Sequence, residues 1–166
     1  VNAAVQEVRP HRIQRALDEG QIAIVAGFQG VSRTGEVTTL GRGGSDTTAV
    51  VLTAALGAQY CEICSDVDGV YTADPRAVPT ATRIDELPLD SAIAMAQAGS
   101  KVLLAEALHQ AKTNGVVLTA SATNQPSGSG TRIVPDAASK EVVGVAADIG
   151  LYLITEPENP QEFAGA

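Results

Sequence analysis

The sequence has few aromatic residues, few basic residues and no long hydrophobic run. Only two Phe and three Tyr stand among its 166 residues, with no Trp, and 19 acidic side chains outnumber 11 basic ones for a formal net charge of -8. These shortages remove the positive surface and the stacking rings that nucleic-acid binding needs. The longest apolar run, residues 22–28, is far shorter than the roughly 20 residues of a membrane span. We therefore expect neither nucleic acid nor a membrane as a partner.

Cysteine is also scarce, and the two cysteines, Cys61 and Cys64, have the spacing of redox and zinc motifs. A zinc site would need a second pair of ligands, and His11 and His109 stand alone and far away in the sequence. A redox pair normally opens a helix, whereas these cysteines lie in an apolar run. We interpret them as ordinary strand or core cysteines of a protein in a reducing compartment such as the cytoplasm.

What the chain does have is enough apolar residues for a core, in a pattern typical of α/β proteins. Hydrophobic residues make up 45% of the sequence and charged residues 18%, which argues against disorder. Strand-length apolar runs alternate with helical patterns of about ten residues, and this alternation predicts a mostly parallel sheet. The expected helices are 10–19, 49–56, 89–98 and 101–114, and the expected strands are 22–26, 59–65, 116–120, 141–147 and 150–155.

The two ends of the chain suggest that it is part of a longer protein. Its first residue is Val and no leader segment precedes the first predicted helix. Residues 121–130, rich in Ser, Asn, Gly and Pro, predict a loop or linker. Two short strands are expected beyond this loop, and the terminal piece that follows them is too short to be a domain.

The strongest chemical signal is the glycine-rich stretch GRGGSDTT at residues 41–48. It is not a Walker A loop, which ends in Gly-Lys-Ser/Thr, and it lacks the third glycine of a Rossmann fingerprint. Its glycines would let a ligand approach the backbone, and free N–H groups at the start of the following helix would attract an anion. The alternative is a glycine-rich turn before an ordinary helix. In either case we expect Ser45 or Asp46 to cap the helix.

Two cations favour the anion-binding interpretation. Arg42 and Lys101 each stand at the predicted start of a helix. A cation there opposes the helix dipole at a cost of about 0.3–1 kcal/mol, which a bound anion would offset. The pattern predicts two anionic ligand groups, and the alternative for Lys101 is a solvated surface lysine.

Carboxylates follow the predicted strand 59–65, at the edge of the sheet where α/β proteins bind ligands. A calcium loop is excluded, because Gly69 follows Asp68 directly and a third ligand is missing. Asp66 and Asp68 could instead accept hydrogen bonds from a ribose or an amine, or support magnesium on a nucleotide. Beyond them, Asp74-Pro75 predicts a turn, and Arg76 adds a third cation.

The sequence offers no credible nucleophilic triad, since its two histidines lie in helical patterns with no Ser or Cys motif nearby. Hydrolase chemistry is therefore disfavoured. Helix starts, glycines, three separated cations and a few carboxylates would neutralise charge and would not supply a base. Such a site is typical of phosphoryl transfer.

Three motifs, in their order and spacing, resemble those of aspartokinases in the amino acid kinase family. They are GFQG at 27–30, TTLGRGGSDTTA at 38–49 and SDVDGVYTADPR at 65–76. The resemblance covers about residues 10–134, and residues 142–155 resemble the opening of the family's regulatory ACT domain. It implies a three-layer αβα fold with a mostly parallel sheet for residues 1–135, the C-terminal, nucleotide-binding part of the kinase domain. It also implies a linker and an incomplete, ferredoxin-like ACT domain for residues 136–166.

The resemblance implies an enzyme that uses ATP to phosphorylate the β-carboxylate of L-aspartate, giving 4-phospho-L-aspartate. This is the first step toward lysine, threonine, methionine and isoleucine. A carboxylate is already an ionised nucleophile, so the reaction needs positioning and charge neutralisation more than a base. Mg²⁺ would be carried by the nucleotide phosphates, so no residue is assigned as a metal ligand. The resemblance also implies a cytoplasmic protein, a feedback effector that is an amino acid, and a homo-oligomer at full length.

The resemblance also assigns roles to individual residues. Asp46 would orient the catalytic cations, and the Arg42 guanidinium would pair with the α-carboxylate of aspartate. The positions that match the family's aspartate-binding residues are Arg42, Gly43, Gly44 and Ser45. Those that match its nucleotide-binding residues are Ser65, Asp66, Tyr71, Arg76, Lys101 and Val102.

The chain departs from the family pattern in three places. The family begins with a strand carrying Lys-Phe/Tyr-Gly-Gly-Thr-Ser, whose lysine contacts the transferring phosphate, and residues 1–21 contain no counterpart. Residues 103–106, LLAE, lack the usual His-Pro or Arg-Ser, and residues 118–121, LTAS, lack an arginine. We expect this chain to be incomplete for catalysis by itself. The alternatives are a kinase of glutamate, acetylglutamate, carbamate or UMP, and a fragment that binds nucleotide without turnover.

Overall fold

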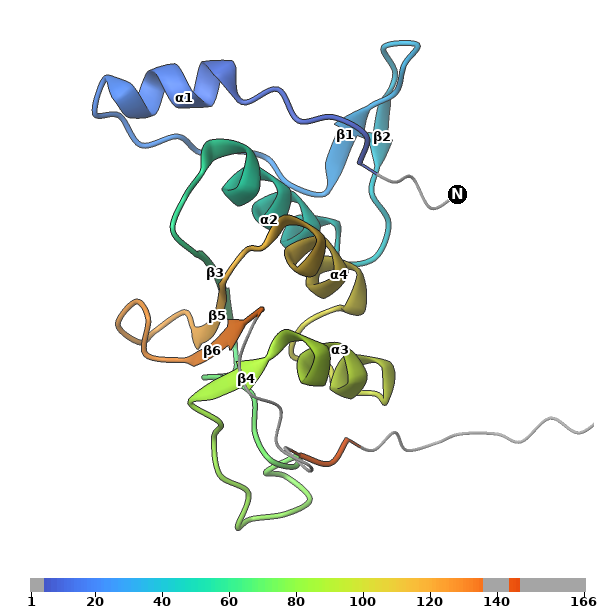
Figure 1. Ribbon diagram of the computed structural model, residues 1–166, viewed down its shortest axis with the longest axis vertical. Helices are drawn as coiled ribbons and strands as arrows, with labels where there is room; N and C mark the ends of the chain where they lie inside the picture. Colours follow the sequence, from blue (N-terminus) through green and yellow to red (C-terminus); the bar gives the residue numbers. More distant parts are fainter. Residues whose placement is uncertain (1–4, 136–143, 147–166) are drawn as a thin grey trace, which may run out of the picture.

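The computed structural model describes residues 5–135 and 144–146 (Figure 1). Helices and strands alternate along most of this part of the chain. In chain order they are α1 (His11–Asp18), β1 (Gln29–Val31), β2 (Val37–Thr39), α2 (Gly44–Leu56), β3 (Cys61–Ser65), β4 (Glu86–Pro88), α3 (Leu89–Gln97), α4 (Ala105–Asn114), β5 (Leu118–Ala122) and β6 (Thr131–Val134).

Within the described residues, the main sheet has four strands in the order β3-β5-β6-β4. β3 is parallel to β5, with Cys61 opposite Leu118, and β4 is parallel to β6, whereas β5 and β6 are antiparallel. This confirms the expected α/β class with a mostly parallel sheet. The pair β1 and β2 forms a separate antiparallel hairpin, with Val31 opposite Val37.

Three helices pack beside the sheet, and the core lies between them and the strands. α2 contacts β3 and α4, and α3 contacts β4, β6 and α4. Leucine and isoleucine supply the largest fully buried apolar side chains, namely Leu87, Leu89, Leu108, Leu118 and Ile133. None of the helices in the described part of the chain is long and apolar enough to cross a membrane.

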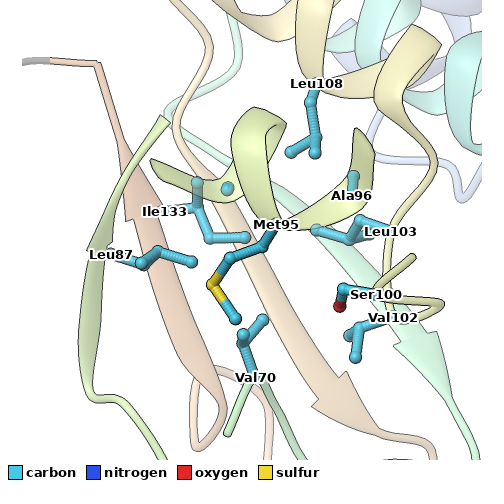
Figure 2. Close-up of a pocket in the computed structure, with 10 residues that line it drawn as sticks. Val70, Leu87, Met95, Ala96, Ser100, Val102, Leu103, Leu108 and Ile133 are labelled. Carbon is cyan, nitrogen blue, oxygen red and sulfur yellow. The ribbon is translucent and has the colours of Figure 1, made fainter. Parts of the chain in front are cut away.

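The hollow drawn in Figure 2 is part of this core. Val70, Met95 and Leu103 are among the apolar side chains that line it, and its volume is only about 10 Å³. Such a space is about the size that one water molecule needs. It is far too small for a nucleotide, so the ligand site must be sought at the surface.

Several elements predicted from the sequence are confirmed, with small shifts at their ends. The helices expected at 10–19 and 89–98 are α1 and α3, the strand expected at 59–65 is β3, and the strand expected at 116–120 is β5, two residues later. The 121–130 loop begins after Ala122, where β5 ends. The strand expected at 150–155 lies outside the described residues. Of the one expected at 141–147, only residues 144–146 are described, and they form no strand.

The strand predicted at residues 22–26 is wrong. The structure has no strand there, and Ile22 and Ile24 are 92% and 97% exposed. The apolar run has the composition of a strand, but a strand also needs a partner for its backbone groups. No neighbouring strand among the described residues pairs with this segment.

Candidate active site

The glycine-rich stretch forms the turn that leads into α2. Gly43 is the N-cap residue, with φ of 75°, a left-handed conformation that favours glycine. Ser45 and Asp46 lie inside the first turn, and α2 has no side-chain cap, so the predicted capping role of these two residues is wrong. Ser45 Oγ instead donates to Asp46 Oδ1 at 3.3 Å. The start of α2 therefore keeps backbone N–H groups without a side-chain acceptor, as an anion site requires.

The GFQG motif packs against this turn, which brings two of the three sequence motifs together. The Phe28 N–H donates to Thr48 Oγ1 at 3.2 Å, and that hydroxyl donates to the Gly44 carbonyl at 2.6 Å. A Cβ built on Gly44 would lie 3.2 Å from Cα of Phe28, so the close approach depends on glycine. Phe28 itself has a φ of 70°, a strained value for a residue other than glycine, and such strain is concentrated at functional sites.

The start of α4 is a second uncapped helix N-terminus beside the first. Leu104 is its N-cap residue, in an extended conformation and with no side-chain cap. α2 and α4 pack against each other (Figure 1), and the Leu104 side chain contacts Gly43. Arg42 is exposed and directly precedes Gly43. Lys101 is also exposed, but it lies three residues before the N-cap, so the predicted helix start at residue 101 is wrong.

Both helix starts lie at the edge of the sheet where β3 and β5 end. α2 packs on β3 and a short connection after Gly57 links the two, so α2 runs back along the strand and its start is directed toward the end of the sheet at which β3 finishes. α4 leads into β5 in the same way after Gly115. Because β3 and β5 are parallel, the two strand ends and the two helix starts share one edge. Open α/β sheets bind ligands at this edge.

Ser65 and Asp66 occupy that edge, as predicted. Ser65 is the last residue of β3, and its carbonyl accepts hydrogen bonds from the N–H and the hydroxyl of Thr123, each at 3.0 Å. Its own Oγ donates to the Val67 carbonyl at 3.2 Å. Asp66 is exposed. The Ser65 backbone is thus held by the neighbouring strand, while the Asp66 side chain faces solvent.

Asp68 and Tyr71 are engaged with each other and with a residue that the sequence analysis missed. Tyr71 OH donates to Asp68 Oδ1 at 3.0 Å, and this bond raises the pKa of the tyrosine. Arg83 Nη1 lies 3.5 Å from the other carboxylate oxygen and donates to the Asp68 carbonyl at 3.4 Å. Asp68 therefore stabilises its own loop, and its oxygens are less available to a ribose than expected. Only the backbone bridge between Tyr71 and Arg83 brings Arg83 here, and no local sequence signal predicts it.

The remaining predicted residues lie in different surroundings, some at the surface and some in the core. Asp74 Oδ1 accepts from the Arg76 N–H at 2.9 Å, which confirms the predicted turn and leaves the Arg76 side chain exposed. Val102 lines the core hollow of Figure 2, so a nucleotide contact from this residue would come from its backbone. Cys61 and Cys64 are free and lie in β3, as predicted for strand cysteines. Burial raises the pKa of the Cys61 thiol, while Cys64 is exposed and is not a core residue.

Comparison with known proteins identifies the family of this chain. The sequence model of the amino acid kinase family matches residues 1–119. The chain belongs to this family. Among family members, the aspartokinase of Corynebacterium efficiens is 47% identical over 171 residues, which cover 98% of this chain and 41% of that protein. The aspartokinase of Thermus thermophilus is 45% identical, over 96% of this chain and 40% of that protein. The chain thus spans about two fifths of the length of these relatives.

Solved structures of amino acid kinases agree with the fold described above. E. coli aspartokinase III in complex with aspartate and ADP matches with a TM-score of 0.69 and 39% identity, over 77% of this chain and 28% of that one. Clostridium acetobutylicum aspartate kinase matches with a TM-score of 0.71 and 31% identity, over 82% of this chain and 32% of that one. A UMP kinase from Bacillus anthracis, at 20% identity and a TM-score of 0.59 over 80% of this chain and 53% of that one, shows a shared fold alone.

Proposed function

We propose that this chain is part of an aspartate kinase, which transfers the γ-phosphoryl group of ATP to the β-carboxylate of L-aspartate. The observation that carries the proposal is the pairing of two uncapped helix starts, α2 and α4, at the ligand-binding edge of the sheet. Each is accompanied by an exposed cation, Arg42 or Lys101. Two anions brought together need such neutralisation, because their mutual repulsion is a large part of the barrier. The similarity to aspartokinases supports aspartate as the acceptor.

The α2 start would bind the acceptor. The Arg42 guanidinium would pair with the α-carboxylate of aspartate, and the N–H groups at Gly43 and Ser45 would face its oxygens. Gly44 would contribute by keeping the turn compact, since its N–H already donates to the Gly41 carbonyl at 3.1 Å. Asp46, in the first turn of α2, would orient the cations that neutralise the transferring group. This turn has few side chains, which would allow the close approach of a small amino acid with two carboxylates.

The nucleotide would lie along the ends of β3 and β5 and toward the start of α4. Ser65 and Asp66 stand at the sheet edge, Tyr71 and Arg76 lie on the following loop, and Lys101 precedes α4. Arg76 and Lys101 are exposed cations, as phosphate contacts require. The Tyr71 ring is held by its bond to Asp68, so it would offer a fixed edge to the nucleoside.

Mg²⁺ fits this site as an ion carried by the phosphates. No three His, Cys, Asp or Glu side chains converge as a metal site in the described ranges 5–135 and 144–146. Mg²⁺ commonly binds through one or two carboxylates together with substrate phosphates, and Asp46 and Asp66 could serve in this way. When bound, the ion would neutralise phosphate charge, while the residues of this chain bind and orient the two substrates.

The proposed domain boundary lies after residue 135, with a linker and an incomplete ACT domain over residues 136–166. Almost all of this second part lies outside the described residues. E. coli aspartokinase III has a structure in complex with lysine and aspartate. We infer that an amino acid effector would bind through the ACT part of the complete enzyme, that the enzyme would assemble as a homo-oligomer, and that it would act in the cytoplasm.

A hydroxylamine trapping assay tests the proposed function. It would be run with ATP, Mg²⁺ and L-aspartate on this chain and on the complete reading frame of its gene. An acyl phosphate product would appear as a hydroxamate. We expect hydroxamate from the complete reading frame, and Arg42→Ala to raise the KM for aspartate by about tenfold or more, because a charge-assisted pair contributes about 1.5–3 kcal/mol.

Two outcomes would contradict the proposal. Hydroxamate from glutamate but not from aspartate, or turnover with carbamate or UMP, would favour another amino acid kinase. Binding of ATP by the complete reading frame, measured by calorimetry, without turnover of any of these acceptors would favour a nucleotide-binding protein that is not a catalyst.

A further inference from the structure

The two leucines that precede α4 point to different parts of the molecule. Leu103 is 4% exposed and lines the core hollow, as Figure 2 shows. Leu104 is half-buried and packs against Gly43. A Cβ built on Gly43 would overlap Cδ1 of Leu104 and would lie 3.1 Å from its Cβ and 3.2 Å from its Cγ. The Leu104 side chain therefore occupies the space that any larger residue at position 43 would need.

This contact joins the N-cap residues of two helices. Gly43 is the N-cap of α2 and Leu104 is the N-cap of α4, and neither helix has a side-chain cap. A cap usually fixes the first turn of a helix through a hydrogen bond from its own chain. Here the Leu104 side chain packs on the Gly43 turn, and this contact joins the two helix starts directly.

We propose that Leu104 is a positioning residue of the proposed kinase site, which holds the Gly43 turn and so aligns the acceptor-binding start of α2 with the phosphate-binding start of α4. The proposal rests on the proposed function above. Leu104 carries no charge and no hydrogen-bonding side chain, so its contribution is steric. Through Gly43 it would fix Arg42 and Ser45, which flank the turn.

The size of the expected effect follows from the contacts that the Gly43 turn would make with aspartate. A charge-assisted pair such as that of Arg42 with a carboxylate contributes about tenfold or more to binding, so a loosened turn should weaken aspartate binding by about tenfold. Removing the side chain of Leu104 leaves the cations, the glycines and the helix N–H groups in the sequence. It loosens only their relative placement, so substrate binding should suffer more than fold stability.

The first test compares KM values in the hydroxamate assay, using the complete reading frame. Leu104→Ala should raise the KM for aspartate by about tenfold and change kcat by less than about threefold, because it weakens binding in the ground state and the transition state alike. Leu104→Met keeps the volume and should keep the KM within about twofold. The matched control is Leu56→Ala, at the other end of α2, about 18 Å away by helix rise, where the leucine is also half-buried. Leu56→Ala should leave the KM for aspartate unchanged.

A second test probes the contact between Gly43 and Leu104 through thermal stability and needs no enzymatic activity. Gly43→Ala should lower the Tm of the wild-type chain, because alanine is strained at a φ of 75° and its Cβ meets Leu104. In the Leu104→Ala background the overlap with Cδ1 is gone, and only the backbone strain and the 3.1 Å approach to Cβ remain. The same change should therefore lower the Tm by about half as much or less. When Gly43→Ala is combined with Leu56→Ala, the two decreases in Tm should be additive.

The outcomes separate this inference from the proposed function. Equal KM values for Leu104→Ala and Leu56→Ala, or additive Tm changes for Gly43→Ala and Leu104→Ala, would overturn the positioning role. If the wild-type protein forms no hydroxamate, the proposed function fails. The Tm values of the Gly43→Ala and Leu104→Ala variants, alone and combined, would then test only whether the two residues are in contact. A raised KM together with non-additive Tm values would support the proposal.

Discussion

At the scale of single residues, the loop between Val70 and Ile84 depends on one buried hydroxyl. Thr131 is fully buried in β6, where its Oγ1 accepts from the Val70 N–H at 2.8 Å and donates to the Ile84 carbonyl at 2.6 Å. These two backbone groups mark the ends of the loop that carries Tyr71 and Arg76. One side chain from the far end of the kinase segment thus closes the base of the loop.

Thr131→Val should destabilise the protein by about 1–3 kcal/mol, because it leaves the Val70 N–H and the Ile84 carbonyl buried without a partner. Thr131→Ser keeps the hydroxyl and is the matched control, with a smaller loss from the missing methyl group. Urea unfolding of the wild type and of the two variants would measure the differences in unfolding free energy. Equal midpoints for the valine variant and the wild type would show that the two backbone groups find other partners.

At the scale of elements, Glu62 fastens the 123–130 loop to the sheet. Its carboxylate, on β3, accepts hydrogen bonds from Ser121 Oγ at 2.7 Å, from the Gly128 N–H at 2.9 Å and from Ser127 Oγ. The bonds from Ser127, Gly128 and Ser121 together lower the pKa of Glu62. The loop begins beside Ser65, so its attachment also supports the end of β3, where we propose that ligands bind.

The lowered pKa of Glu62 gives a pH dependence with a definite sign. The folded state binds the Glu62 proton less tightly than the unfolded state does. The stabilisation is therefore complete above the unfolded-state pKa of about 4.3 and is lost as pH falls through the lower folded-state value. Glu62→Gln should lower the urea midpoint at pH 7, and the gap to the wild type should close as the pH falls below about 4.

Glu86→Gln is the control for this titration. Glu86 pairs with Arg132 at 3.0 Å, but both side chains are more than half exposed, so the pair should contribute little. A gap between Glu62→Gln and the wild type that stays constant from pH 7 to pH 3 would show that the carboxylate charge does not hold the loop.

The sequence predicted the elements with strong local patterns and missed those that depend on distant partners. α3 is within one residue of its expected length, and β3 ends at the expected residue, because their apolar residues meet the core directly. β4 has three residues and ends in Pro88, and no local pattern distinguishes it from a loop until β6 pairs with it. The hairpin of β1 and β2 has a turn signal at Gly35, with φ of 88°, but its strands are equally short.

For the candidate site, the sequence indicates the individual segments but not how they are arranged in space. The stretch 41–48 and the Ser65 edge were found because glycines and strand ends are local signals. The relation between them was not, since it depends on the packing of α2 against α4 and on the Leu104 contact with Gly43. Arg83 was missed because its partner, Asp68, lies fifteen residues away across an irregular loop.

At the scale of the whole molecule, apolar residues are divided between a dense core and an exposed N-terminal segment. Ile133 is fully buried in β6, while Ile24 is 97% exposed. Val31 and Val37, paired across the hairpin, are 71% and 73% exposed. Hydrophobicity alone therefore says little about which isoleucine stabilises this chain.

Ile133→Ala should cost about 2–5 kcal/mol of unfolding free energy, and Ile133→Val about 0.5–1.5 kcal/mol, because each leaves a cavity in the core. Ile24→Ala should change it by less than about 0.5 kcal/mol, as a surface change does. Chemical denaturation of this chain would compare the three variants. A loss for Ile24→Ala as large as that for Ile133→Val would mean that residues 22–26 pack on the molecule in solution.

The strand order also determines when the sheet can form during synthesis on the ribosome. The outer strands of the main sheet, β3 and β4, are made first, and the central strands, β5 and β6, are made last. Between Pro88 and Leu118 the growing chain holds two strands of this sheet and none of their partners. At about 5–20 residues per second this interval lasts about 2–6 seconds. Neither outer strand can pair within this sheet until translation has passed α4, so the sheet is completed from its centre by the last strands to emerge.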